Sequence, residues 1–288
     1  MNPQLIKVIP NPNHSFSVRR DVVPYFYNRW HFHPEIELVH IEEGHGIQFM
    51  GDSISHFGKG DVLLIGSGLP HYWRCDDAFF ESRPNLFAIA NVAHFKDNFW
   101  GVEFLDLPEN KKIRDLLYRA KRGILVPDNI RKSIIDILKE MLPAEGAERI
   151  YLLLKALHML AQQKELHSFS SAGYHLEVSA GETERINEIY KFSLSNFREK
   201  ITLAQVAAIA NMSPTAFCRF FKGHTKKNYN SFLHELRIGH ASKLLIENKR
   251  TITQICHDSG FNNVTNFYKT FKKITGKTPQ EYQRSYLG

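Results

Sequence analysis

Hydrophobic and polar positions change their period along the chain and divide it into three parts. Residues 16–104 form short segments separated by turn signals such as EEGHG and GKGD, a pattern typical of antiparallel β-strands. In residues 111–122, 130–141 and 147–164, apolar positions recur three and four apart, which predicts three amphipathic helices. From residue 184 onward every periodic segment is helical. The pattern predicts an all-β unit followed by helices, and then an all-α unit.

The segment that joins these parts is rich in Ser, Gly and Ala and has no sustained periodicity, which is typical of an interdomain connection. We therefore predict a first domain at residues 1–164, a linker at residues 165–183 and a second domain at residues 184–288. The helix expected at residues 147–164 carries one apolar stripe, formed by Ile150, Leu153, Leu154, Leu157 and Leu160. This stripe either forms the interface of a homodimer, which we expect, or packs against its own domain.

The all-α part contains an internal repeat. Three positions recur at an offset of 49: Val206, Ala207 and Met212 correspond to Ile255, Cys256 and Phe261. Four more recur at an offset of 50: Phe217, Arg219, Phe221 and Lys222 correspond to Phe267, Lys269, Phe271 and Lys272. Each copy has the pattern of a helix-turn-helix motif. The periodic segment between the copies, residues 229–248, predicts a helix roughly 30 Å long, close to the spacing of about 34 Å between successive major grooves.

Charge is distributed unevenly along the chain, whose formal net charge is +7. Residues 182–288 contain 17 Lys and Arg against 8 Asp and Glu, whereas residues 1–181 contain 20 against 22. Surplus basic side chains favour a polyanionic partner, because neutralising phosphates releases condensed counterions. A solubilising surface is the alternative. Because the basic part coincides with the repeat, we predict binding to double-stranded DNA.

The second helix of each copy has one face opposite its Phe pair, at about 100° per residue. Amide, hydroxyl and basic side chains on or beside that face suit contacts with base edges and phosphates. The predicted DNA-contacting residues are Thr215, Ala216, Arg219, Lys222, Asn262, Asn263, Thr265, Asn266, Lys269, Lys273 and Lys277. Among them, we expect Arg219 to read a base in the major groove and Lys277 to contact a phosphate.

The last hundred or so residues resemble the DNA-binding region of the AraC/XylS family of bacterial transcription regulators. The resemblance rests on the repeat, on Arg237 and Ala241, and on the tail SGFNNVTNFYKTFKKITGKTP followed by Tyr282. The departures are Cys256, where a small residue is common, and Gln283, which separates Tyr282 from Arg284. The resemblance implies a sequence-specific regulator, not an enzyme, with operator DNA and RNA polymerase as partners.

Histidines and a glutamate gather in the first part. In WHFHPEIELVHIEEGHG, we expect His31, His33 and Glu37 to share one face of a strand that Val39 continues. The later segment GKGDVLLIGSGLPHYW supplies His71. These segments resemble the two cupin motifs, whose three histidines and one glutamate bind a divalent metal in a small β-barrel. The departures are Gly66 and Cys75, which stand where the second motif usually has Pro and Asn.

The cupin-like segments leave two kinds of ligand open. One is a divalent metal held by His31, His33, Glu37 and His71. The other is an organic effector, of which a sugar is one candidate, bound in a pocket lined by His31, His33, Glu37, Val39, His71 and Trp73. A metal-dependent cupin dioxygenase or isomerase fused to a DNA-binding region is the alternative function.

Composition places the chain among ordinary globular proteins, because 43% of its residues are hydrophobic and 23% are charged. No apolar run approaches the roughly 18 residues that cross a bilayer. The first residues lack the basic and apolar regions of a signal peptide. We therefore expect a cytoplasmic protein without membrane contact.

Overall fold

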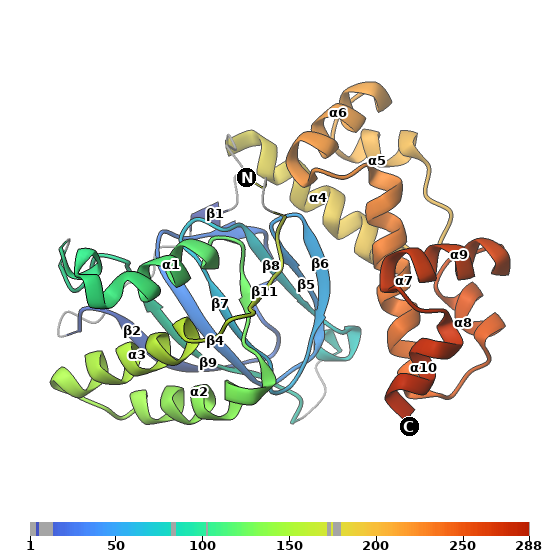
Figure 1. Ribbon diagram of the computed structural model, residues 1–288. Helices are drawn as coiled ribbons and strands as arrows, with labels where there is room; N and C mark the ends of the chain where they lie inside the picture. The colour runs from blue at the N-terminus through green and yellow to red at the C-terminus, as the bar shows by residue number, and fades with distance from the viewer. Residues whose placement is uncertain are drawn as a thin grey trace. The chain divides into compact units, whose positions relative to one another are not determined.

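A computed structural model describes residues 4–5, 14–81, 85–101, 103–171, 174 and 180–287. The chain divides into two compact units, Asn2–Glu177 and Val178–Gly288. Figure 1 shows the first as strands with helices on one side, and the second as helices alone. This architecture confirms the predicted fold class, an all-β barrel with helices followed by an all-α unit. None of the helices within the described ranges combines the length and hydropathy that a transmembrane segment requires.

Two sheets form the β-unit. The five-stranded sheet has the order β1 (Gln4–Leu5), β3 (His31–Phe32), β8 (His71–Cys75), β5 (Gly46–Met50) and β6 (Ser53–Phe57). The six-stranded sheet has the order β11 (His167–Ser168), β10 (Ile124–Leu125), β7 (Val62–Ile65), β4 (Ile36–Glu43), β9 (Ala88–Phe95) and β2 (Ser17–Val23). Apolar side chains of both sheets share one core, in which Val39, Leu63 and Val92 meet Met50 and Trp73. The sheets therefore face each other across a barrel-like interior.

Three helices cover the outer face of the six-stranded sheet (Figure 1). They are α1 (Lys111–Ala120), α2 (Asp128–Met141) and α3 (Gly146–Ala161), preceded by the short helices η1 (Asp77–Phe80), η2 (Phe104–Asp106) and η3 (Pro108–Asn110). Leu153, Leu157 and Leu160 of α3 are fully buried in one core with Leu38 and Leu64 of the sheet. Most of the apolar stripe therefore packs against its own domain, and the expectation that it forms a dimer interface was wrong for these three residues.

Gly66 and Cys75, the two departures from the cupin pattern, both have structural reasons. The Gly66 N–H donates to the Ala120 carbonyl at 2.7 Å, and a Cβ on Gly66 would lie 2.4 Å from the backbone where α1 ends. A proline lacks that N–H and carries a ring, so it does not fit. The buried Cys75 Sγ accepts a hydrogen bond from the Phe26 N–H at 3.4 Å.

The predicted linker, residues 165–183, is too long at both ends. Strand β11 at its start pairs with β10, and the Ser170 hydroxyl donates to the Met50 carbonyl at 2.7 Å. Helix α4 (Ala180–Asn196) begins inside its other end. A two-residue strand is too short to produce a periodic pattern, which explains the error. Residues 172–173 and 175–179 lie outside the described residues.

The helical unit shows the repeat in its hydrogen bonds. After α4 it contains α5 (Leu203–Ile209), α6 (Pro214–Thr225), α7 (Tyr229–Glu247), α8 (Ile252–Asp258), α9 (Val264–Thr275) and α10 (Pro279–Leu287). Thr202 and Thr251, 49 residues apart, each form a capping box with the glutamine three residues later. Ser213 and Asn263, 50 residues apart, are the N-caps of α6 and α9. The two copies therefore begin and end their helices at equivalent residues.

Candidate ligand pocket and nucleic-acid interface

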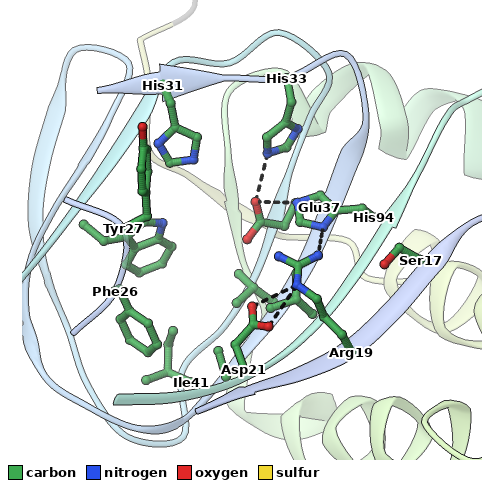
Figure 2. Close-up of a pocket in the computed structure, with 14 residues that line it drawn as sticks. Ser17, Arg19, Asp21, Phe26, Tyr27, His31, His33, Glu37, Ile41 and His94 are labelled. Carbon is green, nitrogen blue, oxygen red and sulfur yellow. Dashed lines mark hydrogen bonds and ion pairs between the residues drawn. The ribbon is translucent and has the colours of Figure 1, made fainter. Parts of the chain in front are cut away.

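Three neighbouring strands supply matched rows of side chains to a cavity of about 440 Å³ (Figure 2). Glu37 of β4 pairs with His94 of β9, and His94 with Ser17 of β2. The two rows below, listed in the same strand order, are Val39, Val92 and Arg19, and then Ile41, Ala90 and Asp21. Side chains two apart on a strand share a face, which is why whole rows point inward. Phe26, Tyr27, His31, His33 and Trp73 complete the lining.

The sequence pattern suggested that His31, His33 and Glu37 lie on one strand, but they do not. Strand β3 ends at Phe32 and belongs to the five-stranded sheet, whereas β4 begins at Ile36 in the six-stranded sheet. Pro34 separates them, and its missing N–H cannot continue a ladder. The three side chains nevertheless converge, because the two sheets face each other across the cavity. His71 lies beside them on β8, where it pairs directly with His31, but it is fully buried and does not line the cavity, contrary to the prediction.

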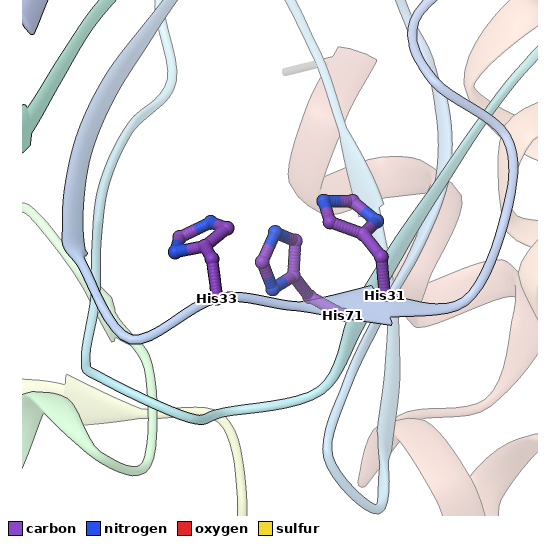
Figure 3. Close-up of side chains that lie close together, drawn as sticks. All are labelled: His31, His33 and His71. Carbon is purple, nitrogen blue, oxygen red and sulfur yellow. The ribbon is translucent and has the colours of Figure 1, made fainter. Parts of the chain in front are cut away.

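The imidazoles of His31, His33 and His71 lie close together (Figure 3) and are anchored in the same way. Each Nδ1 lies 2.8–2.9 Å from a backbone carbonyl oxygen, in turn that of Arg29, Glu35 and Leu69. A carbonyl can only accept, so each Nδ1 carries the hydrogen and Nε2 is the atom left for other partners. His71 is fully buried, and its Nε2 has no hydrogen-bond partner in the described part of the chain.

Glu37 is the buried anion of the pocket. Its Oε2 lies 3.0 Å from His33 Nε2, 3.2 Å from His94 Nε2 and 3.5 Å from His71 Nε2. Burial alone would raise the pKa of Glu37, but the facing histidines outweigh it and hold that pKa well below its usual value. Burial lowers the pKa of His33, but its bond to Glu37 outweighs burial and the pKa is raised. The contact therefore favours the carboxylate form of Glu37 and the protonated form of His33.

His94 is the pocket residue that sequence reasoning missed. Its Nδ1 accepts a hydrogen bond from Arg19 Nη1 at 2.9 Å, so its Nε2 carries the hydrogen that is donated to Glu37. Burial lowers the pKa of His94, which favours this neutral form. The only sequence signal is that Ala90, Val92 and His94 share one parity in AIANVAHF. That signal becomes informative once β9 is known to pair with β4.

The donor set fits a divalent metal. The Nε2 side of three anchored histidines and a carboxylate is a combination that Zn, Fe, Mn or Ni accepts. Donor atoms of His31, His33 and His71 lie within 4.8 Å of one another, as do those of His33, Glu37 and His94. The carbonyl acceptors behind the three Nδ1 atoms are the usual second partners of metal-binding histidines. Trp73, which the sequence analysis predicted in the pocket, lines the cavity, whereas the neighbouring Tyr72 is a core residue.

On the helical unit, α6 and α9 bury one face and expose the other. Phe217, Phe221, Phe267 and Phe271 are fully buried. The exposed residues are Thr215, Arg219 and Lys222 of the first copy, and Asn262, Asn263, Thr265, Asn266, Lys269, Lys273 and Lys277 of the second. Ala216 is half-buried. The Asn263 side chain accepts from the Asn266 N–H at 2.9 Å, so it holds the start of α9.

Comparisons with known proteins divide the chain in the same way. Residues 14–80 match the AraC-like ligand binding domain, and residues 206–285 match a helix-turn-helix domain. The uncharacterized HTH-type transcriptional regulator YobQ of Bacillus subtilis is 27% identical over 169 residues, which are 58% of this chain and 61% of that protein. An uncharacterized HTH-type regulator of Staphylococcus aureus, SACOL0084, is 27% identical over 38% of this chain and 15% of its own length. The chain therefore spans less than two thirds of either relative.

A third relative and one of two solved structures cover most of the chain. The HTH-type transcriptional activator RhaR of Mannheimia succiniciproducens is 22% identical over 89% of this chain and 87% of its own length. ToxT of Vibrio cholerae, solved with a methylnaphthalenyl butenoic acid, is 13% identical over 94% of this chain and all of its own, with a TM-score of 0.37. The DNA-binding domain of AdpA, solved with target DNA, is 24% identical over 35% of this chain and 92% of its own, with a TM-score of 0.34.

A ligand-binding β-barrel and a double helix-turn-helix unit in one chain define a class of transcription regulators. Within that class, the first unit is similar to the ligand binding domain of AraC-type regulators, and the second matches a helix-turn-helix domain. The relatives are regulators, so they favour a regulator over the alternative of a cupin enzyme.

Proposed function

We propose that the chain is a DNA-binding transcription regulator controlled by a small molecule in its barrel. The observation that carries this proposal is the equivalence of α6 and α9, which start at equivalent caps and expose hydroxyl and basic side chains at matching positions, namely Thr215 and Thr265, Arg219 and Lys269, and Lys222 and Lys272. Helix α7 has 19 residues and is about 28 Å long, which suits two recognition helices in successive major grooves. The cavity of about 440 Å³ is of the size that small ligands occupy.

The test starts from the full chain and a pool of random duplexes. We expect repeated selection to enrich one operator, and the enriched duplex to bind more tightly than a scrambled duplex of the same composition. Specific sites usually exceed random DNA by about a thousandfold or more. Equal binding to both duplexes would identify a sequence-independent DNA-binding protein and contradict the proposal.

We also propose that His31, His33, His71 and Glu37 hold a divalent metal. The unpartnered Nε2 of the buried His71 supports this, because a buried polar atom without a partner costs free energy that a metal bond would remove. A bound metal would supply a positive charge toward a polar group of the ligand. The measurement is the metal content of the purified chain, with His71→Ala as the variant that loses the metal and His45→Ala, on an exposed loop, as the variant that keeps it.

The remaining partners follow from the proposed role. A regulator that acts at an operator meets RNA polymerase there and works in the cytoplasm. A homodimer is retained as a prediction, although the buried residues of α3 give it less support than the sequence suggested. Light scattering of the full chain, with and without operator DNA, measures the oligomeric state directly.

A further inference from the structure

The pocket is polar at one end and largely apolar at the other, where the Arg19–Asp21 ion pair lines one side. His31, His33 and Glu37 lie at one end of the view in Figure 2, and Phe26 and Ile41 lie at the opposite end. Below the polar row, Val39, Val92, Ile41 and Ala90 form an aliphatic floor, and Phe26, Tyr27 and Trp73 add aromatic rings. A ligand with polar groups on all sides, such as a sugar, would leave several of them against this apolar surface. The lining is better matched to a molecule with one polar group and an apolar body.

Arg19 is the cationic group at the side of this cavity. Its Nε donates to both carboxylate oxygens of Asp21, at 3.0 and 2.9 Å, and its Nη1 donates to His94. Nη2 has no hydrogen-bond partner within the described ranges, and the side chain is 42% exposed while it lines the cavity. Asp21 therefore uses only one nitrogen of the guanidinium. Arginine binds carboxylates best through two nitrogens that donate in parallel to the two oxygens, and Asp21 does not use this bidentate geometry.

From this arrangement we infer that the effector is a small organic anion. Its acidic group binds Arg19 in competition with Asp21, and its apolar body lies between the aliphatic floor and the aromatic rings. This inference rests on the proposed function, because it specifies the ligand of the same barrel. Without a ligand, the carboxylate of Asp21 neutralises the charge of Arg19, and this stabilises the guanidinium beside an apolar surface.

The same arginine connects the ligand to the buried anion. Arg19 donates to His94, and His94 donates to Glu37. A ligand that draws Arg19 away from Asp21 also changes the hydrogen bond that fixes the His94 tautomer. The polar end of the pocket is therefore coupled to the acidic group of the ligand through one imidazole.

The experiment uses the full chain and two probes of the same shape, 3-phenylpropanoate and its neutral amide, 3-phenylpropanamide. Calorimetric titration is expected to show that the acid binds about tenfold or more tightly than the amide. Arg19→Gln should remove that preference. Asp21→Asn removes the internal competitor, so it should strengthen binding of the acid severalfold. Arg20→Gln is the matched control, because the neighbouring Arg20 pairs with Glu42 and does not line the cavity.

Three results would overturn the inference. They are equal affinity for acid and amide, equal effects of Arg19→Gln and Arg20→Gln, and weaker acid binding by Asp21→Asn. Absence of binding by both probes at millimolar concentration would count against it as well. Tryptophan emission of each variant shows whether the barrel is still folded. The proposed regulatory function is tested separately by operator selection, so a failure here with specific DNA binding intact would reject only the ligand class.

Discussion

The pocket and the recognition helices use similar charged residues in opposite ways. In the pocket, Glu37 and His33 are almost completely buried and bound to each other. On α6 and α9, Arg219 and Lys269 are exposed. A buried pair is strongly coupled to the stability of the fold, whereas an exposed charge contributes little until a partner arrives. Mutations in the first region should therefore change folding, and those in the second should change DNA affinity.

The largest expected effect tests the buried side of this contrast. Glu37→Gln removes the buried carboxylate that both His33 and His94 contact, so we expect the free energy of unfolding of the barrel to fall by about 3–5 kcal/mol. Glu42→Gln on the same strand is the control, because Glu42 forms a partly exposed pair with Arg20. Glu42→Gln should lower the free energy of unfolding by about 1 kcal/mol or less.

Denaturant unfolding followed by tryptophan fluorescence measures this difference. The three tryptophans, Trp30, Trp73 and Trp100, all lie in the first unit. The signal therefore reports the barrel and not the helical unit. Similar losses for Glu37→Gln and Glu42→Gln would mean that burial does not distinguish the two carboxylates.

The second prediction tests the exposed side. The helical part holds a surplus of basic residues, 17 against 8 acidic ones in residues 182–288. If several of them contact phosphates, the affinity of the full chain for duplex DNA should fall about a thousandfold between 50 and 200 mM salt. The stability of the barrel should hardly change over the same range, because buried pairs are screened little. A DNA affinity that is independent of salt would contradict the assignment of this face.

The sequence predicted the helical unit better than the pocket. Phe217 and Phe221 recur at an offset of 50, so one copy supports the assignment of the other, and both pairs are buried in the structure. In the pocket, spacing brought together His31, His33, Glu37 and His71 but attributed three of them to one strand. His94 was missed because it is 57 residues from Glu37 in the chain, and only the pairing of β4 with β9 brings them together.

The stripe on α3 shows a different limit. An apolar stripe at helical spacing predicts that Leu153 and Leu157 are buried, but it does not specify what covers them. The structure shows that the six-stranded sheet does. The polar segment around β11 gave no periodic signal, because its two residues cover only one repeat of the alternation that marks a strand.

The third prediction separates base reading from phosphate binding. Arg219 is exposed on α6, one turn from its start and opposite the buried Phe217. A two-nitrogen contact to guanine contributes about 1–3 kcal/mol of discrimination, so Arg219→Ala should weaken operator binding about 10- to 100-fold and random DNA much less. Fluorescence anisotropy with both duplexes measures the two affinities. Equal losses would assign Arg219 to phosphate contact and leave Thr215, Asn266 and Lys269 as candidates for base reading.

The smallest expected effect compares the two copies of the repeat. Lys227 and Lys277 are equivalent at an offset of 50, and each N–H donates to the hydroxyl of the threonine two residues earlier. Their ammonium groups differ, because Lys227 Nζ lies 2.7 Å from a Glu235 oxygen, whereas Lys277 Nζ donates to the uncharged Ser285 hydroxyl at 3.1 Å. The charge of Lys227 is already matched by a carboxylate, so Lys277 is the better phosphate ligand.

Lys277→Ala should therefore weaken operator and random DNA equally and make the salt dependence shallower by about one unit, whereas Lys227→Ala should leave that slope nearly unchanged. Glu235→Gln provides the sharper test, because it removes the carboxylate and leaves the lysine in place. If the ion pair with Glu235 prevents Lys227 from contacting DNA, Glu235→Gln should make the salt dependence of DNA affinity steeper. Adding Lys227→Ala to this variant should reverse that increase. If Lys227→Ala and Lys277→Ala changed the salt dependence of DNA affinity equally, Glu235 would not neutralise Lys227 toward DNA. The two copies would then differ in sequence but present the same charge to DNA.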